Sequence, residues 1–190
     1  TTDYSWVGLV LQVTPTINWA SELADHIEAN SNGIVNVNTV SGWGSSAQSL
    51  STYDNIFGFG NFSSFLKFPY RVEVDIPDTV VGSVIWAQVG KLPEITDDTY
   101  TLHETDRTDY TWILQPLDMT AVSSAKSLSS DIVDNSSGPV GLLSVAKWSG
   151  VGQGLDYYYT QIGVGNYSTR FGYPYQIEVN VNIGFTVTWP

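Results

Sequence analysis

The chain has 190 residues, of which 42% are hydrophobic, and its 19 acidic and seven basic side chains give it a formal net charge of −12. This length can bury a sizeable core, either in one domain or in two small ones. The basic residues are scattered singly, whereas phosphate groups are bound by clustered Lys and Arg, so nucleic acids and anionic membranes are not expected as partners. The absence of cysteine excludes disulfides, thiolate metal sites and a cysteine nucleophile.

No apolar run approaches the roughly 18 residues that a membrane-spanning helix needs, and the first residues lack a basic region followed by an apolar stretch. The sequence therefore predicts a soluble, already processed chain with no membrane insertion. Three Asn-X-Ser acceptor patterns, at Asn61, Asn135 and Asn166, favour an extracellular or surface-exposed setting, as in a secreted protein or a virion.

The first half of the chain contains mostly strand patterns. Residues 4–13, 34–40 and 70–76 combine apolar, β-branched and aromatic side chains with alternation, and residues 79–89 are a further apolar candidate. One helix is expected, capped by Asn18 or Ser21 and continuing to Ala29, with Leu23, Ile27 and Trp19 on one face. The main alternative is a pure sandwich in which this segment is a loop.

The second half repeats the first at an offset of 105 residues. Positions 30–76 and 135–181 share 17 identities in 47, counted directly along the sequence. With an offset of 106, residues 2–7 also match residues 108–113. The twin of the helix is expected over residues 122–133, with Leu128 and Ile132 on its apolar face, and the twin of the last strand candidate over residues 179–189.

The predicted fold class is mainly β, either β-sandwich-like or α+β with one short helix per half. Two duplicated units related by approximate twofold pseudo-symmetry are expected, because a repeat of about a hundred residues is too long for a solenoid unit. We assign residues 1–90 to the first unit, 91–106 to an acidic connector, and 107–190 to the second unit.

Paired glycines mark two further segments, Gly58 with Gly60 and Gly163 with Gly165. A phosphate-binding loop would need a third glycine, a lysine and a following helix, which these segments lack. A bulge or a close approach of another backbone is the better explanation for the missing Cβ atoms.

No residue set predicts catalysis, so no catalytic residue, metal site or cofactor is assigned and the protein is expected not to be an enzyme. The two histidines, His26 and His103, do not recur in the other half and are interpreted as ordinary polar residues. Two acidic residues are retained in both halves, Asp3 with Asp109 and Glu73 with Glu178. Their positions favour turn capping and a solvated sheet face over glycoside hydrolysis.

Aromatic residues supply the only candidate binding site. Seven Trp and eleven Tyr are present in a chain with few charges. Some of them lie beside turn residues and retained amides, a combination that binds neutral polar ligands through ring stacking and hydrogen bonds. The candidate ligand-binding residues are Trp43, Gln48 and Tyr53 in the first half and Trp148, Gln153 and Tyr158 in the second. The competing interpretation is that Trp43 and Trp148 close the end of a sheet.

The sequence therefore favours a non-enzymatic, lectin-like protein that recognises carbohydrate, or a protein surface, through two equivalent aromatic sites. The alternative is a self-assembling structural protein, such as a viral capsid or spike domain or a surface appendage subunit. A β-rich membrane-active toxin fits the aromatic content but not the absence of a long amphipathic alternating segment.

Overall fold

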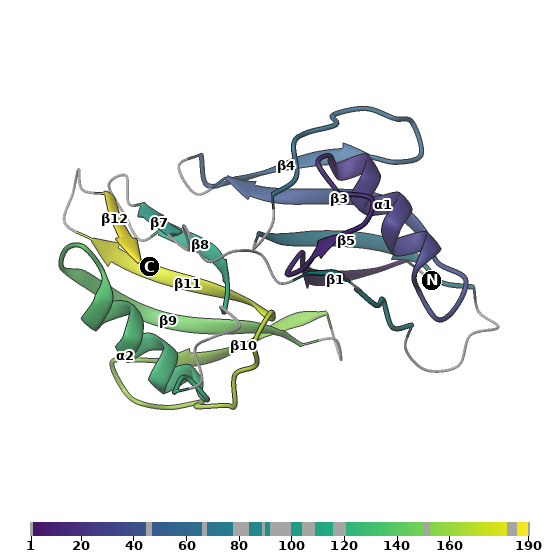
Figure 1. The fold of residues 1–190 in the computed structure, drawn as a ribbon. Helices are drawn as coiled ribbons and strands as arrows, with labels where there is room; N and C mark the ends of the chain where they lie inside the picture. The colour runs from purple at the N-terminus through teal and green to yellow at the C-terminus, as the bar shows by residue number, and fades with distance from the viewer. Residues whose placement is uncertain are drawn as a thin grey trace. The chain divides into compact units, whose positions relative to one another are not determined.

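The structure is a computed structural model that describes residues 2–44, 47–65, 68–77, 84–88, 90–91, 100–103, 109–115, 121–149, 153–181 and 186–189. The fold is mainly β, with two four-stranded sheets and two short helices (Figure 1). Two compact units divide the chain: the first comprises Thr1–Gly42 and Leu50–Glu94, and the second comprises Trp43–Ser49 and Ile95–Pro190. The boundary after Glu94 falls in the predicted connector, of which residues 92–99 and 104–106 lie outside the described residues.

The sheet of the first unit has the strand order β1-β5-β3-β4. Its strands are β1 (Thr2–Gly8), β3 (Asn36–Gly44), β4 (Ser49–Asp54) and β5 (Pro69–Asp75), and the helix α1 (Ala20–Ala29) connects the first two of them. A small two-stranded sheet pairs β2 (Gln12–Val13) with β6 (Gly90–Lys91).

The sheet of the second unit has the corresponding strand order, β8-β11-β9-β10. Its elements are β8 (Asp109–Leu114), α2 (Ala125–Asn135), β9 (Val140–Ser149), β10 (Gly154–Tyr159) and β11 (Pro174–Val181). A second small sheet pairs β7 (Tyr100–His103) with β12 (Thr186–Trp189).

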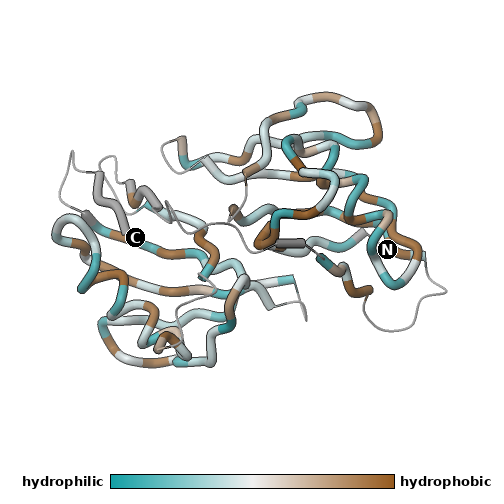
Figure 2. The backbone as a smooth tube through the Cα atoms, viewed as in Figure 1, coloured by the Kyte–Doolittle hydropathy of each residue, from teal (hydrophilic) through white to brown (hydrophobic). Residues whose placement is uncertain are grey.

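Each unit has its own core, in which the apolar side of the helix packs on one face of the sheet. Leu23 and Ile27 of α1 belong to a buried cluster with residues of β3 and β5, and Leu128 and Ile132 of α2 belong to a separate cluster with residues of β9 and β11. Along β5 and β11, apolar and polar residues alternate (Figure 2), as expected when only one sheet face packs against a helix.

The register of the two sheets is equivalent at the offsets seen in the sequence. Tyr4 lies opposite Glu73 as Tyr110 lies opposite Glu178, which reproduces the 106-residue offset of the first strand. A bulge falls between Val37 and Thr39 and at the matching place in the second sheet, opposite Glu178 and Val179. The duplicated sequence blocks therefore have matching local structure.

Both predicted helices form, so the pure sandwich with loops in their place is wrong. The helix α1 begins at Ala20 instead of after Asn18 or Ser21, because the Glu22 carboxylate accepts the backbone N–H groups of Asn18 and Trp19, at 2.7 and 3.2 Å. Trp19 is the residue before the first turn and is exposed instead of lying on the apolar face. The helix α2 begins three residues later than predicted, with Ser124 as its cap.

The predicted strand over residues 4–13 is broken after Gly8. The side-chain amide of Gln88 donates to the Gly8 carbonyl at 2.6 Å and accepts the N–H of Val10 at 3.1 Å, which replaces a neighbouring strand. The next strand candidate covers residues 79–89, of which residues 79–83 and 89 lie outside the described residues. In the described part of this segment, Trp86 forms an isolated β-bridge with Ser31. The predicted twin of this segment contains the end of β11 and the strand β12.

Candidate functional site

The six predicted ligand-binding residues occupy three kinds of position. Trp43 and Trp148 lie in the strands β3 and β9 and are half-buried, so neither lies in the loop expected from its glycine and serine neighbours. Gln48 and Gln153 lie in the turns after these strands, with positive φ angles of 47° and 52°. The remaining pair, Tyr53 and Tyr158, is buried in the two cores.

Within the second unit, Trp43 and Gln48 converge on the backbone of one residue. The Trp43 indole Nε1–H and the Gln48 Nε2–H both donate to the carbonyl of Tyr110, at 3.0 and 2.9 Å, and Gln48 Oε1 accepts the Tyr110 N–H at 2.8 Å. A side-chain amide thus takes the place of a neighbouring strand at the outer edge of β8. These polar groups already form hydrogen bonds with the Tyr110 backbone, which favours a structural role for Trp43 and Gln48.

Their counterparts are arranged differently. The Trp148 Nε1 atom is buried and has no hydrogen-bond partner among the described residues, and Gln153 is exposed. Tyr53 and Tyr158 belong to separate cores, whereas Trp43 and Gln48 are brought together on the Tyr110 backbone.

A different cluster forms on the face of the second sheet that lies opposite α2. Strand pairing places four side chains in one row across the sheet, because Tyr159 lies opposite Ser144, Ser144 opposite Glu178, and Glu178 opposite Tyr110. Tyr157 lies two residues before Tyr159 and therefore on the same face. We call Tyr110, Tyr157, Tyr159 and Glu178 the tyrosine face.

The two β10 tyrosines form a stacked pair on this face. Their ring centroids are 5.6 Å apart with an interplanar angle of 13°, and Tyr159 remains 46% exposed. Tyr110, at the other end of the row, is 36% exposed. The face thus offers aromatic surface on both sides of a carboxylate.

A hydrogen bond holds that carboxylate in place. Ser144 Oγ donates to Glu178 Oε2 at 2.6 Å, and Tyr110 lies opposite Glu178 on the neighbouring strand. Burial and the Glu178 charge both raise the pKa of Tyr110. The pKa of Tyr157 is also raised, most by burial and then by the neighbouring Tyr110, Tyr159 and Glu178. Tyr110 and Tyr157 are therefore neutral hydrogen-bonding groups beside the Glu178 carboxylate.

The corresponding row of the first sheet lacks the aromatic pair. At an offset of 105 residues, Tyr157 and Tyr159 correspond to Thr52 and Asp54. Glu73 keeps a longer hydroxyl contact, with Thr39 Oγ1 at 3.4 Å, and the Arg71 guanidinium lies 4.9 Å from the centre of the Tyr4 ring. The two units therefore share a framework but differ on this face.

The alternation of the segment Asp156–Tyr159 could have revealed the tyrosine face. A strand over this segment would bury Tyr158 and turn Tyr157 and Tyr159 to the other side. The strands β4 and β10 were not predicted, because they contain serine, aspartate and glycine, which are typical of turns. The sequence places the retained Glu178 on a solvated face. In the structure, Glu178 is half-buried beside Ser144.

His26 is the titratable residue with the clearest structural partner in the first unit. Its Nδ1 atom accepts the Trp86 Nε1–H at 3.0 Å, and the two rings meet edge to face with centroids 5.8 Å apart. Burial lowers the pKa of His26 below 6.5. Protonation would turn the acceptor Nδ1 into a donor and break this bond.

We expect the first unit to lose stability when His26 is protonated. Since the pKa of His26 is lower in the folded state, the unfolded state takes up the proton first as the pH falls. The stability that neutral His26 contributes is therefore complete above the pKa of His26 in the unfolded state. It is lost as the pH falls through the pKa of His26 in the folded state. Urea unfolding between mildly alkaline and mildly acidic pH should show this slope in the wild type but not in His26→Gln. An unchanged slope in His26→Gln would contradict the assignment.

The chain matches no protein-family model, no curated protein and no solved structure. Within the described part of the chain, no three His, Cys, Asp or Glu side chains are grouped as metal ligands. No helix of that part is both long and apolar enough to cross a membrane.

Proposed function

We propose that this chain is a non-enzymatic, surface-exposed or secreted protein that binds neutral carbohydrate on its tyrosine face. The observation that carries the proposal is the stacked pair Tyr157 and Tyr159, of which Tyr159 lies in one row with the Glu178 carboxylate. The Trp43 and Gln48 region is not part of this site, because its polar groups bond the Tyr110 backbone.

The chemistry of the face suits a sugar. A pyranose ring presents an apolar C–H surface that stacks on an aromatic side chain, and its hydroxyls require acceptors and donors at the rim. Tyr159 provides the exposed ring, Glu178 is an ionic acceptor, and the tyrosine hydroxyls donate or accept. The net charge of −12 opposes sulfated and acidic glycans, so the ligand is a neutral glycan.

The two units are duplicated copies related by approximate twofold pseudo-symmetry in this proposal, yet they provide one site per chain. The matching registers and bulges support the duplication. The second copy has Tyr157 and Tyr159 where the first copy has Thr52 and Asp54. This difference supports a site that arose in the second copy alone. This differs from the two equivalent aromatic sites expected from the sequence.

The test is a glycan array of the intact chain followed by titration calorimetry with a retained glycan. Tyr159→Ala should weaken binding at least about tenfold, which corresponds to ~1.4 kcal/mol. The matched control is Tyr173→Ala, which removes another exposed tyrosine of the second unit, 51% accessible, from a position outside the tyrosine face. This control variant should bind as the wild type does.

Two results would overturn the proposal. One is an array with no retained glycan at high protein density, and the other is equal binding by Tyr159→Ala and the wild type. Large, concentration-dependent species in light scattering without any glycan binding would instead support a self-assembling structural protein. Edge-to-edge pairing is an unfavourable route to such an assembly at β8, where Gln48 occupies the Tyr110 backbone groups.

A further inference from the structure

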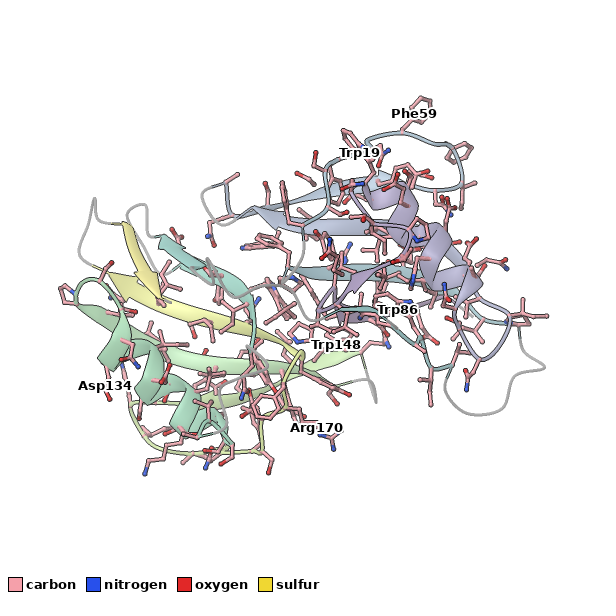
Figure 3. All side chains as sticks on the ribbon, viewed as in Figure 1. Trp19, Phe59, Trp86, Asp134, Trp148 and Arg170 are labelled. Carbon is pink, nitrogen blue, oxygen red and sulfur yellow. The ribbon has the colours of Figure 1, made fainter. Side chains whose placement is uncertain are left out.

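The first unit carries an exposed apolar turn between β4 and β5, over residues 55–60. Ile56, Phe57 and Phe59 are 65%, 70% and 71% exposed, although such side chains are normally buried. Figure 2 shows this stretch as hydrophobic at the outer end of the loop, and Figure 3 shows Phe59 and Trp19 projecting at the same end of the first unit. Trp19 is also exposed, and its neighbour Ala20 donates to the Phe62 carbonyl at 2.9 Å.

Several backbone groups of this apolar turn are hydrogen-bonded within the chain. The N–H groups of Gly58 and Phe59 donate to the Asp54 carbonyl, at 2.8 and 3.2 Å, and the Phe59 carbonyl accepts the Asp54 N–H at 2.8 Å. The Phe57 N–H donates to the Asp54 carboxylate at 3.0 Å. Each group paired in this way lowers the cost of moving the turn into an apolar medium, where an unpaired polar group is unfavourable.

The side chains of the turn are uncharged. Asn55 directs its amide back to the Val37 carbonyl at 2.9 Å, which leaves only Ile, Phe and Gly at the tip. A protein partner would be recognised through a polar rim around an apolar centre, and residues 56–60 carry no polar side chain. Aromatic side chains with a nearby Trp are typical of segments that lie at a lipid–water interface.

Contrary to the expectation from the sequence of no membrane insertion, we propose that the apolar turn inserts Phe57 and Phe59 into the interface of an electrically neutral lipid bilayer. The occupant is a zwitterionic lipid surface, because the net charge of −12 opposes anionic headgroups and no basic cluster is present to bind them. Burial of apolar area drives this contact, so it is insensitive to salt. The proposal does not depend on carbohydrate binding, since it shares no residue with the tyrosine face.

Flotation of the intact chain with phosphatidylcholine vesicles tests the proposal. The wild type should float with the vesicles in low and in high salt, and the double variant Phe57→Ser/Phe59→Ser should bind about tenfold less. The control Phe171→Ser removes an exposed phenylalanine of the second unit and should bind as the wild type does. Tyr159→Ala should also float normally, which separates this test from the carbohydrate proposal.

Several results would overturn the proposal. They are no flotation of the wild type, flotation that requires anionic lipid, or equal flotation of the double variant. Light scattering without lipid provides a further test: an oligomer that dissociates in the double variant would assign the turn to a second copy of the chain. Near-ultraviolet circular dichroism of the double variant should match the wild type, because both replaced side chains are exposed.

Discussion

Gly165→Ala is expected to destabilise the second unit by about 3 kcal/mol or more. A Cβ atom at this position would lie 2.2 Å from the backbone oxygen of Tyr157, which no rotamer change can relieve. The φ angle of +87° adds further strain for any residue with a side chain. Gly60→Ala should have a similar effect in the first unit, where the Thr52 oxygen is 2.4 Å away and φ is +76°.

The close approach arises because, in each unit, the segment that comes after the outer strand of the sheet lies along the edge of that strand. We call this segment the strap. The second strap, residues 164–169, covers the outer edge of β10: the Tyr159 N–H donates to the Val164 carbonyl at 3.0 Å. It then meets the start of α2, where the Ala125 N–H donates to the Tyr167 carbonyl at 2.9 Å. A shift of the strap would therefore displace the strand that carries Tyr157 and Tyr159, and glycan binding should fall together with stability.

The neighbouring glycines provide matched controls. Gly163 and Gly58 also have positive φ angles, +67° and +72°, but a Cβ atom there would meet no atom within 4 Å. Gly163→Ala should therefore cost only the backbone strain, about 1–2 kcal/mol. Urea unfolding measured for both variants checks the difference, and equal losses for Gly163→Ala and Gly165→Ala would contradict the clash.

The periodicity of apolar residues predicted the parts of the fold in which one face is buried. Leu23 with Ile27 and Leu128 with Ile132 identified both helices, and the alternation of residues 70–76 identified β5. The expected close approach of another backbone is confirmed at Gly60 and Gly165. Helix starts were displaced because they depend on individual hydrogen bonds, such as the two that Glu22 accepts.

The candidate site could be predicted less well, because its residues come together through strand pairing. Glu178 and Tyr110 are 68 positions apart, and their contact depends on the β8–β11 register. The aromatic side chain of Trp43 suggested a ligand site, whereas its indole N–H bonds the Tyr110 carbonyl. Aromatic content thus indicates binding chemistry, but the hydrogen bonds of each ring decide whether it is available.

Leu128→Ala is expected to destabilise the second unit by about 3 kcal/mol, because it opens a cavity beneath α2. Leu128 is fully buried in a cluster with Val145 and Ile177, and nothing in that cluster is shared with the core of the first unit. Leu23→Ala makes the same change at the matching position of α1, where Leu23 is also fully buried. The two variants therefore form a symmetric pair.

Hydrogen exchange of the two variants shows whether each core stabilises only its own unit. Leu128→Ala should accelerate exchange in β9 and β11 and leave β3 and β5 protected, and Leu23→Ala should do the reverse. Glycan binding should weaken in Leu128→Ala alone, because the tyrosine face lies on the sheet that α2 covers. Equal acceleration in all four strands by either variant would mean that the two cores unfold as one cooperative unit, contrary to this expectation.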